Sequence, residues 1–379
     1  MRADGTDAAI DAVCAAIRGI PNVWRGLTAP AEQSRFLAAA ARHRLRPLIA
    51  ARLRETGEWR SWPQTVRGAL ADAERAEAAL EIARRQELSR LLAACGSADL
   101  PVLLIKGAAL AYSMYPEPWL RPREDTDLVV RSSDAERADR VLRDCGFRPA
   151  IRQRGRLVTH QRLYHRADAA GRRDAYDLHW KIADPAPFAD LLSVDDLLRD
   201  ASTVAVGDRA RARVPSTSHA LLLACWHRVS HHHDAGDLLW LYDLHLLADR
   251  SSDADARTAI DIARRTGTGP ICARGLRLAA ERFGTGLPSR FIEELEKPDG
   301  AAPSLTVSYL QPDARKVDLL AADLKALPDW ESRARLVREH LFPPAEYMFE
   351  TYGRSNRMLL PVLYLWRIAS GAPRWFRRS

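Results

Sequence analysis

Apolar residues recur every three or four positions along the first part of the chain, which is the spacing of amphipathic helices. The pattern runs from Thr6 to about Cys95 and is clearest over Ile10 to Ile17, Phe36 to Leu53 and Val66 to Leu92. The last of these stretches is rich in Ala, Glu and Arg, which have good intrinsic helix propensity. We therefore expect a helical N-terminal segment.

The period changes at Gly96-Ser97. Pro101 to Ile105 is a short continuous apolar run, which fits a buried strand better than a helix. Strands and helices then alternate, which predicts a small α/β or α+β core. The expected elements are a helix over Ala108 to Met114, a strand over Thr126 to Arg131, and a helix over Ser133 to Cys145, capped by Ser133 and closed by Gly146.

Two further strands, Gly155 to Arg166 and Asp174 to Ile182, flank a turn-like segment and predict a hairpin. Thr203 to Val214 predicts one more strand. The hydroxyl groups of residues 216–218 predict the cap of a helix that starts near His219, and the helical period then continues to residue 379. The expected fold class is α+β: an N-terminal helical segment (1–95), a core with a small mixed sheet (96–214) and a C-terminal helical lobe (215–379).

Composition fits a globular protein with a large core. The chain has 379 residues, of which 47% are apolar, and this length suits two or three subdomains. Its formal charge of +8 comes mostly from scattered Arg. That charge is compatible with a polyanionic partner, but a solvated Arg-rich surface is the favoured interpretation.

The spacing of the cysteines and the sequence of the N-terminus indicate the compartment in which we expect the protein. The five cysteines are widely spaced, with no CxxC pair, so neither a disulfide framework nor a cysteine zinc site is expected. The sequence has no run of 18 or more apolar residues and no signal-peptide pattern at its start. We expect a cytoplasmic protein without a membrane partner.

Two carboxylates open the apolar run at 125–130. Asp125 and Asp127 are one residue apart, so on a strand they face the same side, roughly 7 Å apart, close enough to share divalent cations. Asp177 lies on a later predicted strand, where a buried carboxylate without a partner would be costly. A metal ion would supply that partner, and a salt bridge to Arg172 or Arg173 is the alternative.

These residues resemble a known family. Ile105-Lys-Gly-Ala-Ala-Leu-Ala111, Tyr115-Pro116, Arg121 and Asp125-Thr-Asp-Leu-Val-Val130 are similar to the uncharacterised nucleotidyltransferase family 5 branch of the DNA polymerase beta-like superfamily. The resemblance is firm over Leu103 to Lys181, where it includes Tyr176-Asp-Leu-His-Trp180, and looser elsewhere.

The resemblance implies a nucleotidyltransferase core in which Asp125 and Asp127 hold divalent metal and Asp177 completes the site. Hard oxygen ligands suit Mg²⁺, or Mn²⁺ in its place, and two ions about 4 Å apart would stabilise the attacking and leaving oxygens. The usual turn has glycine or serine after its first glycine, whereas this chain has Gly107-Ala108. Backbone N–H groups at the start of the following helix can still bind the triphosphate of an NTP.

Basic side chains flank the expected site. Lys106 and Arg121 are candidates to neutralise the triphosphate, and Arg123 could take the place of Arg121. A strand-end lysine directed to solvent is the other interpretation of Lys106. His179 follows Asp177 by two residues and so faces the same side, where it could orient the carboxylate, contact phosphate or be a structural histidine.

A histidine-rich segment follows in the C-terminal half, with His227, His231, His232 and His233 beside Asp234. His227 and His231 have helical i,i+4 spacing, but zinc would need a third ligand that the pattern does not assign. Alternatively, some of these histidines line the nucleotide pocket with Trp240, Tyr242 and Asp243. A plain amphipathic helix pair also accounts for the segment.

The function expected from these features is metal-dependent transfer of a nucleoside monophosphate from an NTP to an acceptor, with release of pyrophosphate. The alternative is a nucleotide- or polyanion-binding module without catalysis, which Ala108 favours. The acceptor is open: a small molecule, a peptide, a protein or RNA all fit the sequence.

Overall fold

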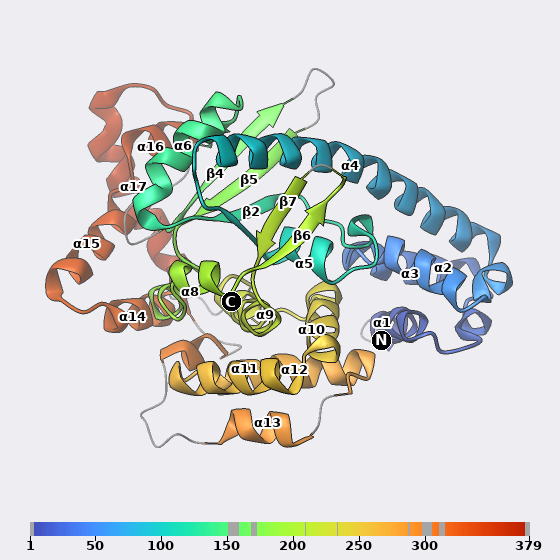
Figure 1. Cartoon of the computed structure of the whole chain (residues 1–379). Helices are drawn as coiled ribbons and strands as arrows, with labels where there is room; N and C mark the ends of the chain where they lie inside the picture. The colour runs from blue at the N-terminus through green and yellow to red at the C-terminus, as the bar shows by residue number, and fades with distance from the viewer. Residues whose placement is uncertain are drawn as a thin grey trace.

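A computed structural model describes residues 4–150, 159–167, 173–208, 210–232, 234–286, 289–297, 305–310 and 315–375. These residues form one seven-stranded mixed sheet surrounded by helices, so the predicted α+β class is confirmed (Figure 1). Among the described helices, none combines the length and the apolar character that a membrane crossing requires.

The sheet has the strand order β3-β4-β5-β2-β1-β7-β6. The pairs β2–β5 and β1–β7 are parallel and the other neighbours are antiparallel. The strands are β1 (Leu103–Ile105), β2 (Thr126–Val129), β3 (Arg148–Pro149), β4 (Gln161–Ala167), β5 (Arg173–His179), β6 (Ser202–Val206) and β7 (Ala210–Val214).

Alternating side chains of the central strands fill two separate cores. On β1, Leu103 and Ile105 belong to one apolar cluster and Leu104 to the other. On β2, Val129 joins the first cluster and Leu128 the second, as the period of two along a strand requires. Asp127 and Val129 alternate with Leu128, so the predicted carboxylate faces the first cluster.

The N-terminal segment is helical, as predicted. Its helices are α1 (Asp4–Arg18), α2 (Pro30–Arg42), α3 (Arg46–Glu55) and the long α4 (Gln64–Ser97). The end of α4 packs over the second cluster together with α6 (Ala135–Asp144), and Figure 1 shows α4 extending across one side of the sheet. The predicted helix after β1 is α5 (Lys106–Ser113).

The C-terminal part is also helical. The predicted cap of α9 is confirmed, because the Ser216 hydroxyl accepts a hydrogen bond from the backbone N–H of His219. The helices after the hairpin are α7 (Ala186–Ala189), α8 (Val194–Arg199), α9 (Thr217–Ser230), α10 (Leu238–Arg250), α11 (Asp253–Arg265), α12 (Gly269–Phe283), α13 (Ser289–Glu296), α14 (Lys316–Ala326), α15 (Trp330–Leu341), α16 (Ala345–Tyr352) and α17 (Leu360–Trp375).

Three local predictions need comment. The single strand expected over Thr203 to Val214 is instead the β6–β7 hairpin, since Gly207 adopts a φ of 65° and turns the chain. Ser133 does not cap a helix: it lies in a 3-10 turn, and α6 starts after it with no side-chain cap. The predicted β4–β5 hairpin is confirmed, although residues 155–158 of the first expected strand lie outside the described residues.

The first apolar cluster joins the N-terminal helices to helices of the C-terminal part. It contains side chains from α1 to α4, from the sheet and from α9 to α13, including Phe36, Leu103 and Leu239. Helix α1 packs directly against α12. The division into three segments at residues 95 and 214 stays a prediction.

Candidate functional site

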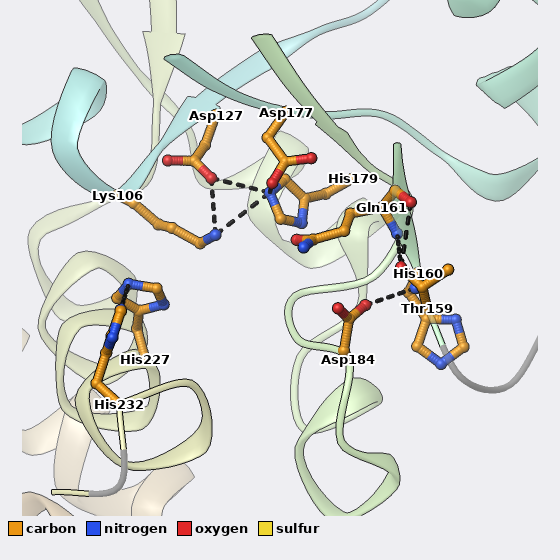
Figure 2. A network of polar contacts seen from close by, with 10 residues as sticks. All are labelled: Lys106, Asp127, Thr159, His160, Gln161, Asp177, His179, Asp184, His227 and His232. Carbon is orange, nitrogen blue, oxygen red and sulfur yellow. Dashed lines mark hydrogen bonds and ion pairs between the residues drawn. The ribbon is translucent and has the colours of Figure 1, made fainter. Parts of the chain in front are cut away.

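The candidate site lies where β1, β2 and β5 meet. Strands β2 and β5 are parallel and in register, so Asp127 pairs with Asp177 and Val129 pairs with His179. Because alternate residues of a strand share a face, Asp127, Asp177 and His179 all project from the same side of the sheet (Figure 2). Their side chains converge although Asp127 precedes Asp177 by about fifty residues in the sequence.

These three buried residues form a candidate metal-ligand group. Each offers one ligand atom, and the three atoms lie within 4.8 Å of one another. The Nε2 atom of His179 is 2.9 Å from Asp127 Oδ1 and 3.8 Å from Asp177 Oδ2. Among the described residues no hydrogen-bond partner reaches Asp177 Oδ1, which is buried. A buried carboxylate oxygen without a partner is costly, so the group fits a bound cation.

Lys106 is the first residue of α5, and its side chain lies against this group. Its Nζ donates to Asp127 Oδ1 over 2.7 Å and lies 3.3 Å from His179 Nε2. Burial by itself would raise the pKa of Asp127, but the Lys106 ammonium and the His179 ring hold that pKa far below its usual range. Burial opposes the charge of Lys106 as well, yet Asp127 raises the Lys106 pKa above its ordinary value. Both groups are therefore charged at neutral pH.

Asp125 stands slightly apart from the ligand group. It precedes β2, is exposed on one side and lines the pocket described below. Burial of its carboxyl group raises the pKa of Asp125 to about 6, and the negative charge of Asp127 adds to this effect. In the described part of the chain it does not join the group formed by Asp127, Asp177 and His179.

Arg121 and Asp243 form a buried pair beside the site. Arg121 Nε and Nη2 donate to Asp243 Oδ1 and Oδ2 over 2.9 and 2.6 Å. Tyr115 Oη donates to the same Asp243 Oδ1 over 2.8 Å. The guanidinium also passes over Gly107, where an added Cβ would lie 2.4 Å from Arg121 Nη1. The glycine of the sequence motif therefore makes room for Arg121.

Two other residues of the motif region are enclosed by protein. Ala108 is fully buried in α5. Arg123 is buried and pairs with Glu81 of α4 over 2.8 Å, although it also contributes to the pocket wall. Its pairing with α4 distinguishes it from Arg121, which is bound to α10.

The histidine cluster faces the carboxylates from the other wall. His227 Nε2 and His232 Nε2 lie 3.1 Å apart, and the Trp240 ring stacks on His232 with 3.9 Å between ring centroids. Burial, together with the positive charge of Lys106, lowers the pKa of His231 to about 3. His233 lies outside the described residues. Among those described, only Asp127, Asp177 and His179 form a ligand group, so the zinc alternative gains no support.

A pocket of about 400 Å³ joins these parts. This is a usual size for a small-molecule site. Of the residues predicted from the sequence, its wall includes Lys106, Gly107, Arg121, Asp125, Asp127, Asp177, His227, His231, His232, Trp240 and Asp243.

Gln161 and Arg44 are among the pocket-wall residues that the sequence did not predict. Gln161 of β4 pairs in register with His179, and its Oε1 atom is buried without a described hydrogen-bond partner (Figure 2). Its polar side chain within the strand expected over Gly155 to Arg166 was an available signal. Arg44 comes from the turn between α2 and α3, where its guanidinium lies 5.6 Å from the Trp240 ring centroid. No local pattern distinguishes Arg44 from the other surface arginines.

The salt bridge that was the alternative for Asp177 involves side chains that the structure does not describe. Arg172 and the side chain of Arg173 lie outside the described residues. The contact recorded for Asp177 is with His179, on its own strand.

Comparison with known proteins adds one match. A family model described as an uncharacterised nucleotidyltransferase matches residues 29–284, more than half of the chain. This match is to the family that the sequence motifs resemble. No curated protein matches the chain.

Proposed function

The chain belongs to the family of uncharacterised nucleotidyltransferases, and on that premise we propose that it is a metal-dependent enzyme. It moves a nucleoside monophosphate from an NTP to an acceptor and releases pyrophosphate. The observation that carries this proposal is the buried group Asp127, Asp177 and His179 at the edge of a pocket of about 400 Å³. The group supplies ligands for a cation next to space for a nucleotide.

The donor set suggests which ion would bind. Two carboxylates suit Mg²⁺ or Mn²⁺, and the imidazole of His179 favours Mn²⁺, which accepts nitrogen more readily. When bound, the ion would neutralise charge on the phosphates and polarise the α-phosphorus. Asp125, two residues before Asp127 and in the same pocket, is the carboxylate available for a second ion.

The chemical step needs little from the protein besides position and charge. An acceptor oxygen or nitrogen forms a bond to the α-phosphorus, the bond from that phosphorus to the bridging oxygen breaks, and pyrophosphate leaves. The acceptor's proton passes to Asp177, whose Oδ1 atom has no described partner. Asp125, Asp127 and Asp177 are thus the proposed catalytic and metal-binding residues.

Other pocket residues are assigned to the nucleotide. Lys106 and Arg121 provide positive charge for the triphosphate, and the start of α5 at Gly107 and Ala108 offers backbone N–H groups. His179 orients Asp127 in addition to offering a ligand atom. Trp240 provides an aromatic surface for the nucleoside, and Asp243 holds Arg121 in place.

A transfer assay tests the proposal. The protein is incubated with each α-labelled NTP and Mg²⁺ or Mn²⁺, while pyrophosphate release is measured and acceptors are searched by mass spectrometry for added nucleotide. We expect release by the wild type and its loss in Asp125→Asn and Asp127→Asn. The exposed Asp195 is a matched control, so Asp195→Asn should retain activity. Unchanged transfer by Asp125→Asn and Asp127→Asn would contradict the assignment.

The same assay separates the alternative function. A nucleotide- or polyanion-binding module would bind NTP in the presence of the metal and release no pyrophosphate with any acceptor. Lys106 on Asp127 and Ala108 in the turn are the features that favour this alternative. A measured NTP affinity without turnover would replace the enzymatic proposal.

A further inference from the structure

The Lys106 ammonium contacts two of the atoms that would hold a metal ion. Its Nζ atom is 2.7 Å from Asp127 Oδ1 and 3.3 Å from His179 Nε2, and these residues provide two of the three members of the candidate ligand group. An ion on the same ligand atoms would sit about 2 Å from each of them. Figure 2 shows the lysine side chain reaching toward Asp127 and His179. The ammonium and the ion would therefore compete for Asp127 Oδ1 and His179 Nε2.

The His179 ring takes part in this competition between the ammonium and the ion. Its Nε2 atom carries either a proton, which it donates to Asp127, or a lone pair, which accepts from Lys106. Only the lone-pair form binds a metal ion. The form of His179 that would bind the ion is therefore the same form that accepts a hydrogen bond from Lys106.

The backbone directs the side chain into the group. Lys106 has a φ of 52°, one of five positive values at non-glycine residues among those described. Such a conformation is unfavourable for a lysine and persists only where the surroundings impose it. Lys106 directly follows β1 as the first residue of α5, and only 13% of its side chain is exposed. The backbone of Lys106 is therefore held in place, and from it the side chain reaches Asp127.

We infer that Lys106 is an internal cation that occupies the metal site in the free protein and moves to the triphosphate when the metal enters. In the free state its ammonium compensates the charge of Asp127. In the loaded state the ion takes over Asp127, and Lys106 turns into the pocket that it already lines. This second state rests on the proposed function, because the phosphates of an NTP provide its new partner.

Opposite effects on two ligands follow from this exchange. Removal of the ammonium should tighten binding of the metal alone, since one positive charge no longer competes for Asp127. The same change should weaken binding of the nucleotide once metal is present, since the phosphates lose a cation. If Lys106 had only a structural role, its removal would not tighten metal binding.

The experiment uses full-length protein in two forms, Lys106→Met and Lys106→Gly. Methionine keeps most of the side-chain volume, and glycine accepts the positive φ without strain. Mn²⁺ binding is measured by calorimetry without nucleotide. We expect both variants to bind Mn²⁺ about tenfold or more tightly than the wild type, because an opposite charge at this distance shifts ionic equilibria by such factors. With saturating Mn²⁺, affinity for a non-hydrolysable NTP analogue should fall by a similar factor.

Lys181 is the matched control. It also makes a 2.7 Å ion pair with an aspartate, Asp190, but does not line the pocket. Lys181→Met should leave both affinities unchanged. Equal Mn²⁺ affinity in the wild type and both Lys106 variants, or no Mn²⁺ binding by any of them, would overturn the inference. Thermal unfolding of each variant establishes that it is folded.

The two arms separate this inference from the proposed function. Tighter Mn²⁺ binding by the variants together with no nucleotide binding would retain Lys106 as the occupant of the cation site, overturn its move to phosphate and contradict the NTP proposal. Transfer activity with no change in Mn²⁺ affinity would retain the enzyme and overturn the role of Lys106.

Discussion

At the scale of single residues, the position of Arg121 requires a glycine at position 107. An alanine Cβ at this position would lie 2.4 Å from Arg121 Nη1 and 3.2 Å from Cζ. The end of an arginine usually moves aside easily, but Asp243 holds this guanidinium by two hydrogen bonds. We expect Gly107→Ala to displace Arg121 and to lower the free energy of unfolding by about 1–3 kcal/mol, as measured by urea denaturation.

A second glycine provides the control for this prediction. Gly68 lies within α4, and a Cβ added there meets nothing within 4 Å. Gly68→Ala should leave the stability unchanged or raise it by up to about 1 kcal/mol, because alanine is the better helix former. Equal effects of the two substitutions would show that Arg121 adapts freely.

The sequence identified some site residues and missed others for a physical reason. Asp127 and Asp177 could be found because each lies on a strand whose period of two specifies the face it occupies. The partner of Arg121 is 122 residues away in the sequence, so the role of Asp243 in holding it depends on how α10 packs. The same holds for Arg44, because only the packing of the N-terminal helices brings it to the pocket.

At the scale of elements, Asp323 of α14 connects three segments. Its Oδ1 accepts hydrogen bonds from Tyr309 Oη, in the 3-10 turn Leu305–Leu310, and from the backbone N–H of Ala186 in α7, over 2.9 and 3.0 Å. Burial raises the pKa of Asp323 to about 6. The unfolded chain therefore loses this proton at lower pH than the folded protein, and folding stability falls as pH rises from about 4 to about 6.

Asp323→Asn should remove this pH-dependent cost while keeping an oxygen for both donors. We expect the variant to unfold at a higher temperature than the wild type at about pH 7.5, and this difference to shrink at about pH 4.5, as measured by calorimetry. Asp318 of the same helix gives the opposite sign, since its hydrogen bond from Arg315 lowers the Asp318 pKa to about 2. Asp318→Asn should destabilise at neutral pH, and its effect should fade below about pH 4. A pH-independent effect of Asp323→Asn would contradict the assignment.

Most elements follow from local sequence, and the exceptions have identifiable causes. Helices α2 to α4 and strands β1 and β2 match their apolar periods. The β6–β7 hairpin was predicted as one strand because apolar residues alternate on both sides of Gly207-Asp208, where the chain in fact reverses. The order of strands in the sheet was not predictable, because β1 and β7 pair across more than a hundred residues.

At the scale of the whole molecule, the pocket depends on contacts between the two helical parts of the chain. Arg44, between α2 and α3, donates to Asp237 at the start of α10 over 3.1 Å, and His43 Nδ1 accepts from the backbone N–H of Leu238. The apolar cluster beneath these contacts includes helices from both parts. The wall carrying Trp240 and the turn carrying Arg44 should therefore lose their structure together.

Leu239→Ala tests this cooperativity. Leu239 is fully buried on α10 in the shared cluster, so its truncation should cost about 2–5 kcal/mol of unfolding free energy. We expect one thermal transition at lower temperature, and hydrogen–deuterium exchange that accelerates in α2 and α3 as much as in α10. Leu365 on α17 is 69% exposed, so Leu365→Ala, the same truncation without burial, should change neither measurement. Exchange that accelerates only in α9 to α12 would show that the N-terminal helices form an independent unit, as the predicted boundary at residue 95 implies.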